Sequence, residues 1–298
     1  MSQKTIAILM PGDMGHGVGL VLNQHGHDVI TSLSGRSARS RALAEAGSVR
    51  DAGDLDATIA EADMILSILP PSAAMKLADD VTAAMSRTGK TPVYVDCNAI
   101  SPGTAQKIGG IITSAGATFI DSGIIGIAPN KSKNTRFYVS GPDTSAMTAL
   151  NGQGFEVLAL GDDIGRASAM KMVYAALTKG SWTLWSAVML TAERNGLLEP
   201  LIREFEHSQQ STLSSMRSII SALPADSERW IGEMEEIAKT FREADVTGDF
   251  HDGAAWMFKL LSETPYASET RQTMDRSRTL ETSLATYAKA LANRKSRN

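Results

Sequence analysis

The sequence is poor in the residues that build metal centres and covalent cross-links. Its single cysteine, Cys97, excludes an intramolecular disulfide and any metal site made of several cysteines. Its five histidines show no ligand spacing, so we expect no bound metal. There is neither a signal-peptide pattern nor an apolar run of membrane-spanning length. These absences predict a cytoplasmic protein with no membrane association.

A strong charge of one sign is also missing. The formal net charge is −4, and acidic and basic residues are spread along the chain. A basic patch or tail would be expected of a protein that binds nucleic acid or an anionic membrane surface. We therefore expect a small-molecule substrate, and no nucleic acid, as the binding partner.

What the sequence does contain is a regular alternation of strands and helices in its first half. The expected strands cover residues 5–10, 27–33, 63–69, 92–97, 118–122, 136–140 and 156–160. Strands that alternate with helices at this spacing predict a doubly wound parallel sheet. From residue 165 onward every segment has helical periodicity: 165–195, 200–222, 226–244, 253–263 and 268–292. The chain of 298 residues is thus expected to form an α/β Rossmann domain, residues 1–163, and an all-α domain, residues 164–298.

A glycine-rich turn follows the first strand. Gly12, Gly15, Gly17 and Gly19 lie between the apolar run TIAILM and an expected helix. Glycines there allow the backbone to approach a bound group, and the free amides at the helix start can bind a phosphate. The full dinucleotide pattern has a further glycine at position 10, where this chain has Met10. A glycine cluster alone is a weak indication, and its strand–turn–helix context strengthens it.

The end of the second expected strand indicates which dinucleotide binds. A site for NAD usually has an acidic residue here, to bind the ribose hydroxyls. This chain has Ser34-Gly35-Arg36-Ser37 instead, and an arginine flanked by hydroxyls suits a 2′-phosphate. We predict NADP(H) over NAD(H). The alternative is that Arg36, with Arg39 and Arg41, belongs to an ordinary solvated surface.

Ligands of doubly wound sheets bind beyond the carboxyl ends of the strands. The segments at that edge include residues 69–72, Asn98 and residues 122–126. Cys97 lies beside them, but no obvious base accompanies it. We expect Cys97 to be a small buried residue and not a nucleophile.

The segment from Gly165 to Gly196 is expected to form one long, largely apolar and therefore buried helix. Its only charges between residues 167 and 192 are Lys171 and Lys179. At about 100° per residue, Lys171 shares a stripe with Tyr174, Ala175, Thr178, Trp182 and Trp185, and Lys179 lies to the side. A buried lysine can act as a proton donor or acceptor near neutral pH. From the helix alone, the preferred explanation of Lys171 is a carboxylate partner or a side chain that reaches water.

The order of these segments resembles the β-hydroxyacid dehydrogenase superfamily. The motif MPGDMGHGVG (residues 10–19) is similar to the cofactor loop of that superfamily, and DCNAISP (96–102) is similar to its Asp-x-Ser-Thr-x-x-Pro segment. The motif DSGIIG (121–126) is similar to its substrate segment, and GRASAMKMVYAA (165–176) is similar to its catalytic lysine helix. The last third resembles a helical domain of unassigned function found on 6-phosphogluconate dehydrogenase-like proteins. The match covers the order and spacing of about the first two-thirds of the chain.

The resemblance implies a hydride transfer between a nicotinamide and a hydroxyl or carbonyl carbon, with Lys171 as the general acid/base. The cofactor would contact Gly12, Asp13, Met14, Gly15, Ser34, Gly35, Arg36, Ser37, Leu69, Pro70 and Asn98. The substrate would contact Ser122, Gly123, Ile124, Ile125, Gly126, Tyr174, Ala175 and Thr178. We also expect a homodimer that forms through the helical domain, because that domain of about 130 residues carries much apolar helical surface.

Three positions depart from the family pattern. Ala175 replaces an asparagine that helps to hold the substrate, and Ile125-Gly126-Ile127 replaces a Ser-Gly-Gly that receives a carboxylate. Thr178 replaces the glutamate used for decarboxylation, so a decarboxylating reaction is not expected. Tyr174, Trp182 and Trp185 suggest a more apolar substrate, although core packing explains them as well. Two alternatives stay open: an imine reductase, against which Lys171 argues, and a non-catalytic NADP-binding sensor.

Overall fold

The computed structural model describes residues 3–295 and divides into two compact units, Met1–Met172 and Val173–Asn298. The long helix α7 (Arg166–Arg194) belongs to both, because the division falls within it. Each unit is described by itself below.

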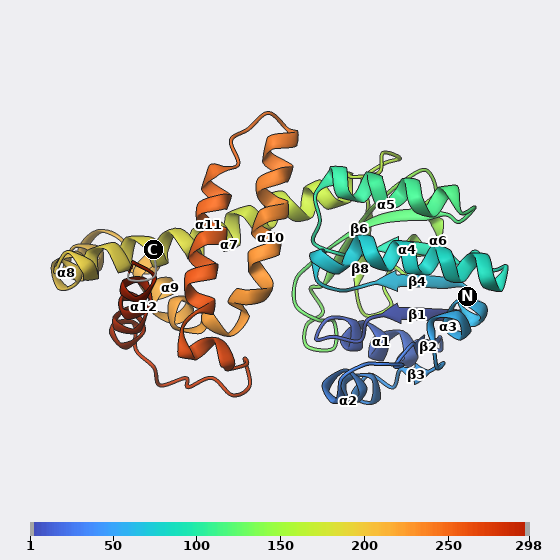
Figure 1. Cartoon of the computed structure of the whole chain (residues 1–298), viewed down its shortest axis with the longest axis horizontal. Helices are drawn as coiled ribbons and strands as arrows, with labels where there is room; N and C mark the ends of the chain where they lie inside the picture. The colour runs from blue at the N-terminus through green and yellow to red at the C-terminus, as the bar shows by residue number, and fades with distance from the viewer. Residues whose placement is uncertain (1–2, 296–298) are drawn as a thin grey trace. The chain divides into compact units, whose positions relative to one another are not determined.

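The first unit is built on one eight-stranded sheet with the order β3-β2-β1-β4-β5-β6-β7-β8 (Figure 1). The strands are β1 (Thr5–Leu9), β2 (Asp28–Thr31), β3 (Arg50–Asp51), β4 (Met64–Ser67), β5 (Val93–Asp96), β6 (Phe119–Ile125), β7 (Arg136–Ser140) and β8 (Glu156–Ala159). All neighbouring pairs are parallel except β6 and β7. The predicted α/β class, with its Rossmann sheet, is confirmed.

Two of these strands differ from the sequence prediction. Strand β3 has two exposed residues, so it lacks the apolar run by which a strand is recognised. Strand β7 is antiparallel to β6, whereas a wholly parallel sheet was expected. The physical reason is the connection: only residues 126–135 separate the two strands, and a parallel crossover needs a dozen or more residues.

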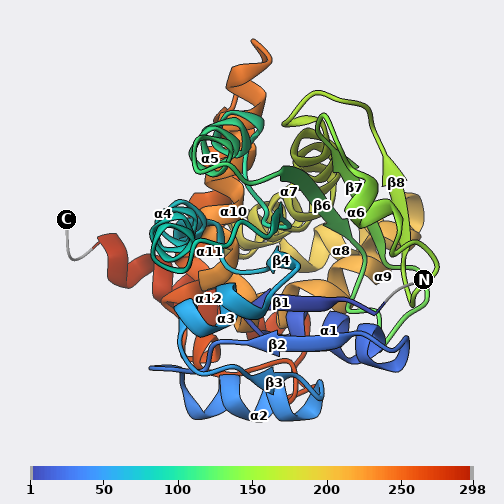
Figure 2. The same ribbon diagram turned by 90° about the vertical axis from the view of Figure 1, so that its right-hand side faces the viewer.

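Alternate side chains of the strands enter two separate cores, one on each face of the sheet. The helices of this unit are α1 (Gly15–Gln24), α2 (Ala38–Ala46), α3 (Leu55–Glu61), α4 (Pro71–Thr88), α5 (Pro102–Ser114) and α6 (Ser145–Thr148). Ile6 and Ile8 of β1 pack with residues of α1, α2 and α6, whereas Ala7 and Leu9 pack with α3, α4 and α5. Figure 2 shows helices on both sides of the strands. This two-sided packing leaves the strand ends as the edge where ligands can bind.

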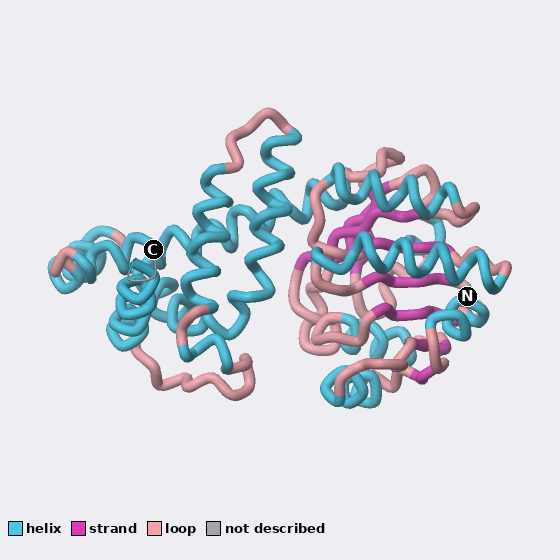
Figure 3. Tube along the Cα trace, viewed as in Figure 1, coloured by secondary structure: helices cyan, strands magenta, loops and turns pink. Residues whose placement is uncertain are grey.

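The second unit consists of helices and the loops between them (Figure 3). They are α8 (Leu198–Ser208), α9 (Gln210–Ile219), η1 (Ile220–Ala222), α10 (Pro224–Glu243), α11 (Asp249–Ser262), η2 (Pro265–Ser268) and α12 (Leu280–Lys295). The all-α class of this region is confirmed. Helix α10 is joined to α11 by a short loop, and the buried Trp230, Met234 and Phe258 lie on these two helices.

Two of the expected helices are wrong in extent. The expected helix 200–222 is divided into α8, α9 and η1, with a break at Gln209, whose backbone is not helical. The expected helix 268–292 begins only at Leu280. Residues between η2 and α12 form a loop, because Thr270, Thr273 and Asp275 bond the nearby backbone amides that a helix would use.

Helix α7 is not buried on every side, contrary to its apolar composition. Met170, Val173, Tyr174, Leu177 and Leu184 are exposed large hydrophobic side chains, and their spacing of three, four and seven residues puts them on one side of the helix. Composition predicted burial, but in the single chain this stripe stays open to solvent.

Candidate active site

The glycine turn joins β1 to α1. The Gly12 amide donates to the Met10 carbonyl at 2.8 Å, and a Cβ placed on Gly15 would collide with that same carbonyl. A Cβ on Gly12 would meet nothing within 4 Å. Gly15 is therefore required for the folding of the turn, whereas the absence of a side chain at Gly12 leaves open space there. The φ angle of Met10 is not positive, so a residue with a side chain can adopt this conformation. The backbone therefore does not require the glycine that the full dinucleotide pattern has at position 10.

The start of α1 fits a phosphate. Its N-cap residue is Met14, whose side chain accepts no hydrogen bond, and the first turn contains no acidic residue. Gly17 packs closely against Asn130 and Ala128 of the β6–β7 loop, which leaves no room for a side chain. Uncapped amides beside an open backbone can receive an anionic group.

The arginines after β2 have different partners. Arg39 pairs with Asp13 of the glycine turn at 2.9 Å, and Arg41 donates to the Leu33 carbonyl at 2.6 Å. Ser37 caps α2 by accepting the Ser40 amide. Across residues 3–295, the Arg36 side chain has no hydrogen bond or ion pair. Arg36 is thus the arginine of this group that is available to a ligand.

Asn98 is fully occupied by protein groups. It is buried, its Oδ1 accepts the Leu69 amide at 2.7 Å, and its Nδ2 donates to Ser67 Oγ and Asp96 Oδ2 at 2.8 and 3.0 Å. Asn98 therefore fixes the start of the Leu69–Pro70 segment. The Asn98 side chain thus has a structural role in addition to the cofactor contact that was predicted for it.

Two buried carboxylates lie on neighbouring strands: Asp96 is the last residue of β5, and Asp121 is the third residue of β6. Asp96 and Asp121 are opposite each other in the register of these strands. Burial raises the pKa of Asp96 to about 7. Burial likewise raises the pKa of Asp121, and the hydrogen bonds from Ser168, Ser140 and the Gly165 amide act against that rise. Neither carboxylate was predicted to have a role; the available signal was an acidic residue within each of two otherwise apolar strand segments.

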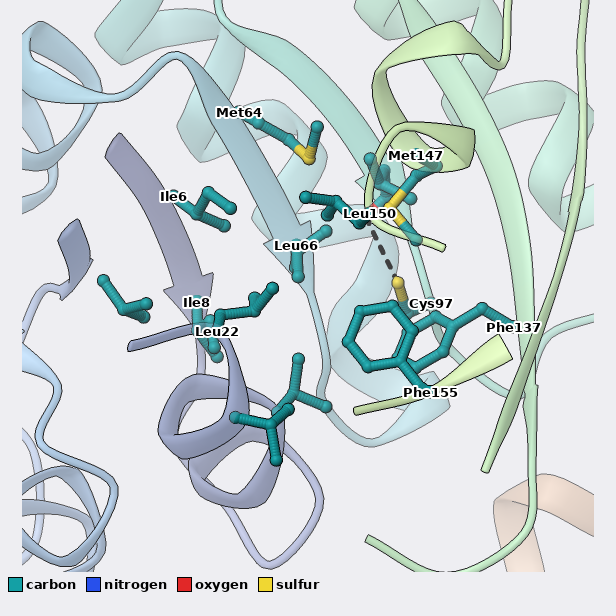
Figure 4. Close-up of a cluster of buried hydrophobic side chains, with 14 of the residues drawn as sticks. Ile6, Ile8, Leu22, Met64, Leu66, Cys97, Phe137, Met147, Leu150 and Phe155 are labelled. Carbon is teal, nitrogen blue, oxygen red and sulfur yellow. Dashed lines mark hydrogen bonds between the residues drawn. The ribbon is translucent and has the colours of Figure 1, made fainter. Parts of the chain in front are cut away.

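Cys97 follows Asp96 and is buried, as predicted. Figure 4 shows its sulfur close to Phe155 and Phe137 in the core. Burial raises its pKa far above the ordinary thiol value, so the reactive thiolate is suppressed at neutral pH.

The predicted substrate segment is the second half of β6. Ser122, Gly123, Ile124 and Ile125 are buried and paired with β7, and Gly126 is exposed. Pairing with β5 ends at Asp121, so in the described chain no strand covers the other edge of β6 beyond that point. In an antiparallel pair alternate backbone groups face away from the partner strand, and at this edge they can meet a ligand.

Lys171 lies directly beside β6. A Cβ placed on Gly123 would be 2.7 Å from both Lys171 Cβ and the Ala167 carbonyl oxygen, so the absence of a side chain at Gly123 is what lets α7 approach the strand. The Lys171 side chain is part-buried, and not fully buried as the apolar helix suggested.

Tyr174, Ala175 and Thr178 follow Lys171 on α7, in the second unit. Tyr174 is 48% exposed and Ala175 is buried, whereas Thr178 donates its hydroxyl to the Ala175 carbonyl at 3.2 Å. The structure thus places Lys171 beside Gly123, within the predicted substrate segment, and leaves Tyr174 open to solvent.

Lys179 has a different environment from Lys171. It is buried in the helical unit, where its Nζ lies 2.8 Å from Glu233 and 5.6 Å from the centre of the Trp230 ring. Trp182 packs on the same ring at 5.4 Å. Lys179 is thus a structural lysine, and core packing explains Trp182.

The structure of residues 3–295 contains neither a metal-binding cluster nor a membrane-spanning helix. No three residues among histidine, cysteine, aspartate and glutamate come together as a metal site there. No helix in that range is both long and apolar enough to cross a membrane.

Comparison with protein families identifies both regions of the chain. Residues 5–152 match the NAD binding domain of 6-phosphogluconate dehydrogenase. Residues 192–261 match a domain of unknown function, DUF1932. Among curated proteins, an uncharacterized 28.5 kDa protein from Methanothermus fervidus is 28% identical over 184 residues, which are 61% of this chain and 68% of that protein.

Solved structures show the same architecture. A conserved protein of unknown function, described as structurally similar to 3-hydroxyacid dehydrogenases, aligns with a TM-score of 0.63 and 25% identity over 86% of this chain and 96% of its own. The 3-hydroxyisobutyrate dehydrogenase of Mycobacterium tuberculosis, solved with L-serine, aligns with a TM-score of 0.65 and 18% identity over 96% and 99% of the two chains. At this identity the second likeness concerns the fold.

The family, the glycine turn at β1 and the lysine at the start of α7 agree with the resemblance found in the sequence. The chain combines an NAD binding domain of the 6-phosphogluconate dehydrogenase type, residues 5–152, with a DUF1932 domain, residues 192–261.

Proposed function

We propose that the protein is an NADP(H)-dependent oxidoreductase that acts on a hydroxyl or carbonyl carbon without decarboxylation, with Lys171 as its general acid/base. The observation that carries the proposal is the close packing of Lys171 against Gly123, on the face of β6 and beside the part of that strand that β5 leaves uncovered. A proton donor at that place can serve a substrate that the strand edge orients.

The first unit has the features that a dinucleotide needs. Gly12, Asp13, Met14 and Gly15 would hold the pyrophosphate at the uncapped start of α1. The nearby cofactor contacts would come from Ser34, Gly35, Arg36 and Ser37 after β2, and from Leu69, Pro70 and Asn98. Arg36 has no protein partner in the described chain, which supports a 2′-phosphate as its ligand and NADP(H) as the cofactor. When bound, the nicotinamide supplies or accepts the hydride.

The residues of the chain provide orientation and proton transfer. Backbone groups at the edge of Ser122–Gly126 would bind the substrate, and Tyr174, Ala175 and Thr178 would contribute from further along α7. In oxidation the Lys171 amine takes the hydroxyl proton, and in reduction the ammonium returns it to the carbonyl oxygen. A positioned acid/base typically contributes about 10²- to 10⁴-fold in rate.

The domain roles follow from this assignment. Residues 1–163 would bind the cofactor, and residues 164–298, which begin with the helix that carries Lys171, would form a homodimer. The exposed stripe on α7 supports the dimer, as does α8, which has no buried residue although Leu201, Ile202 and Phe205 lie on it. Apolar surface of this kind is typical of an interface between subunits.

The test compares the wild type with Lys171→Met and with Lys90→Met, an exposed lysine that serves as the matched control. NADPH and NADH oxidation is followed with a panel of 3-oxo acids, aldehydes and preformed imines. We expect carbonyl-dependent NADPH oxidation that Lys171→Met lowers by about 10²-fold or more and that Lys90→Met leaves unchanged.

Three other results would contradict the proposal in different ways. Turnover of imines alone identifies an imine reductase. Tight NADPH binding without turnover on any substrate identifies a sensor. Carbonyl reduction that survives Lys171→Met removes the acid/base role of Lys171.

A further inference from the structure

The N-terminal turn of α7 is capped by side chains that come mainly from the sheet. Asp121 Oδ2 accepts the amides of Gly165 and Ser168 at 2.9 and 3.0 Å, and its Oδ1 accepts the Ser168 hydroxyl at 2.6 Å. Ser140 Oγ accepts the Ala167 amide at 3.0 Å and donates to Asp121 Oδ2 at 3.0 Å. We call Asp121, Ser140 and Ser168 the remote cap.

We propose that Asp121 is a positioning residue, which through the remote cap sets the place of Lys171 at the substrate edge of β6. The inference rests on the proposed role of Lys171 and explains how that lysine is held. Two features carry it: the carboxylate bonds the first turn of α7, and Gly123, two residues further along the same strand, is in close contact with Lys171.

The geometry makes a rigid connection from strand to lysine. Lys171 is three residues beyond Ser168, less than one helical turn after the capped amides. A displacement of the capped turn therefore moves Lys171 relative to Gly123. Orientation errors of about 1 Å can cost about 10²-fold in rate. A carboxylate at this helix end also suits the partial positive charge of the helix N-terminus.

Asp96 holds the opposite side of the site, which provides a contrast within the same sheet. It accepts the backbone amide and the side-chain amide of Asn98, each at 3.0 Å, and Asn98 in turn holds the Leu69 amide. Asp96 thus fixes the cofactor segment, whereas Asp121 fixes the lysine helix. The two aspartates should affect different measurable quantities.

The experiment uses Asp121→Asn, which keeps the size of the side chain. It replaces one carboxylate oxygen by an NH₂ group, which cannot accept the hydrogen bonds that the amides and hydroxyls of the remote cap donate to Asp121. Asp54→Asn is the matched control, because the Asp54 carboxylate caps a different helix, α3, by accepting the Ala57 amide. We expect Asp121→Asn to lower kcat about 10- to 100-fold with the Kd for NADPH unchanged. We expect Asp96→Asn to weaken NADPH binding, and Asp54→Asn to change neither quantity.

A second readout does not depend on turnover. Acetic anhydride labelling, read by mass spectrometry, gives the reactivity of the Lys171 amine relative to that of Lys90. Asp121→Asn should change this ratio several-fold, and Asp54→Asn should not. If the wild type proves to have no oxidoreductase activity, the proposed function fails but the labelling ratio still tests the positioning.

Ser168→Ala is the second variant in case Asp121→Asn does not fold. It removes one donor to the remote cap and should change kcat and the labelling ratio in the same direction to a smaller extent. The proposal is overturned if the soluble cap variants keep the wild-type labelling ratio, or if kcat and NADPH binding fall together by the same factor.

Discussion

Asp96 and Asp121 face each other across strands β5 and β6, and each binds the backbone of a different half of the candidate site. Asp96 holds the cofactor segment through Asn98, and Asp121 holds the start of α7. Burial, and with it the negative charge of Asp121, makes ionisation of Asp96 more costly and so raises the pKa of Asp96.

Stability should fall as the pH rises from about 4 to about 7, in part because of Asp96. Burial raises its folded pKa to about 7, above the unfolded value of about 3.9, so the folded state binds the extra proton between these pH values. The loss is on the order of 4 kcal/mol and ends above pH 7. Urea unfolding between pH 4.5 and 8 measures it, and Asp96→Asn should flatten that slope. Equal slopes for the two proteins would contradict the assignment.

Gly12→Ala and Gly15→Ala should separate cofactor binding from folding. A methyl group on Gly12 meets no protein atom, so thermal stability should hold, whereas NADPH affinity should fall about tenfold or more because the pyrophosphate needs that space. The methyl group of Gly15→Ala collides with the Met10 carbonyl and should cost about 1–3 kcal/mol of stability. Thermal melts with and without NADPH distinguish the two. Unaltered NADPH binding by Gly12→Ala would place the cofactor elsewhere.

Arg36→Ala should weaken NADPH binding about 10- to 100-fold and leave NADH binding nearly unchanged. The reason is the loss of a charged hydrogen bond to the 2′-phosphate, typically worth about 1.5–3 kcal/mol. Fluorescence titration with both cofactors measures the effect. Arg87→Ala is the control, because it breaks only an exposed pair with Asp56, a residue outside the proposed cofactor site. If the wild type binds NADH as tightly as NADPH, the NADP(H) preference is wrong.

Lys179→Met should destabilise the helical region by about 3–5 kcal/mol, since it removes the ammonium group that lies 2.8 Å from the carboxylate of the buried Glu233. The double variant Lys179→Met/Glu233→Leu should recover most of that loss, because both buried charges are then removed. Urea unfolding of the single and double variants checks this. A double variant no more stable than Lys179→Met would mean that the pair is not the source of the loss.

Leu177→Glu combined with Leu184→Glu should convert a dimer to a monomer. The two side chains are 73% and 63% exposed in the single chain, and a charge on the α7 stripe would oppose its burial against a second copy. Sedimentation equilibrium should give about twice 31.7 kDa for the wild type and the single value for the variant. Val246→Glu, an exposed apolar site away from the stripe, is the control. A monomeric wild type ends the dimer proposal.

Local patterns were sufficient to predict the sheet, the glycine turn and the position of Lys171. Apolar runs of four to seven residues, turn glycines and helical periodicity each act over a short stretch of chain, so they can be read without the tertiary structure. The same signals missed the break at Gln209 and the loop before Leu280, where side chains compete for backbone amides.

The sequence by itself determined most of the strands and the helix that carries the lysine, because these depend on near neighbours along the chain. The tertiary structure decided what those elements are used for. Only folding brings Asp121 to the amide of Ser168, 47 residues away, and Lys179 to Glu233, 54 residues away. The physical reason is that buried carboxylates and ammonium groups must find partners, and the packing of distant segments selects those partners.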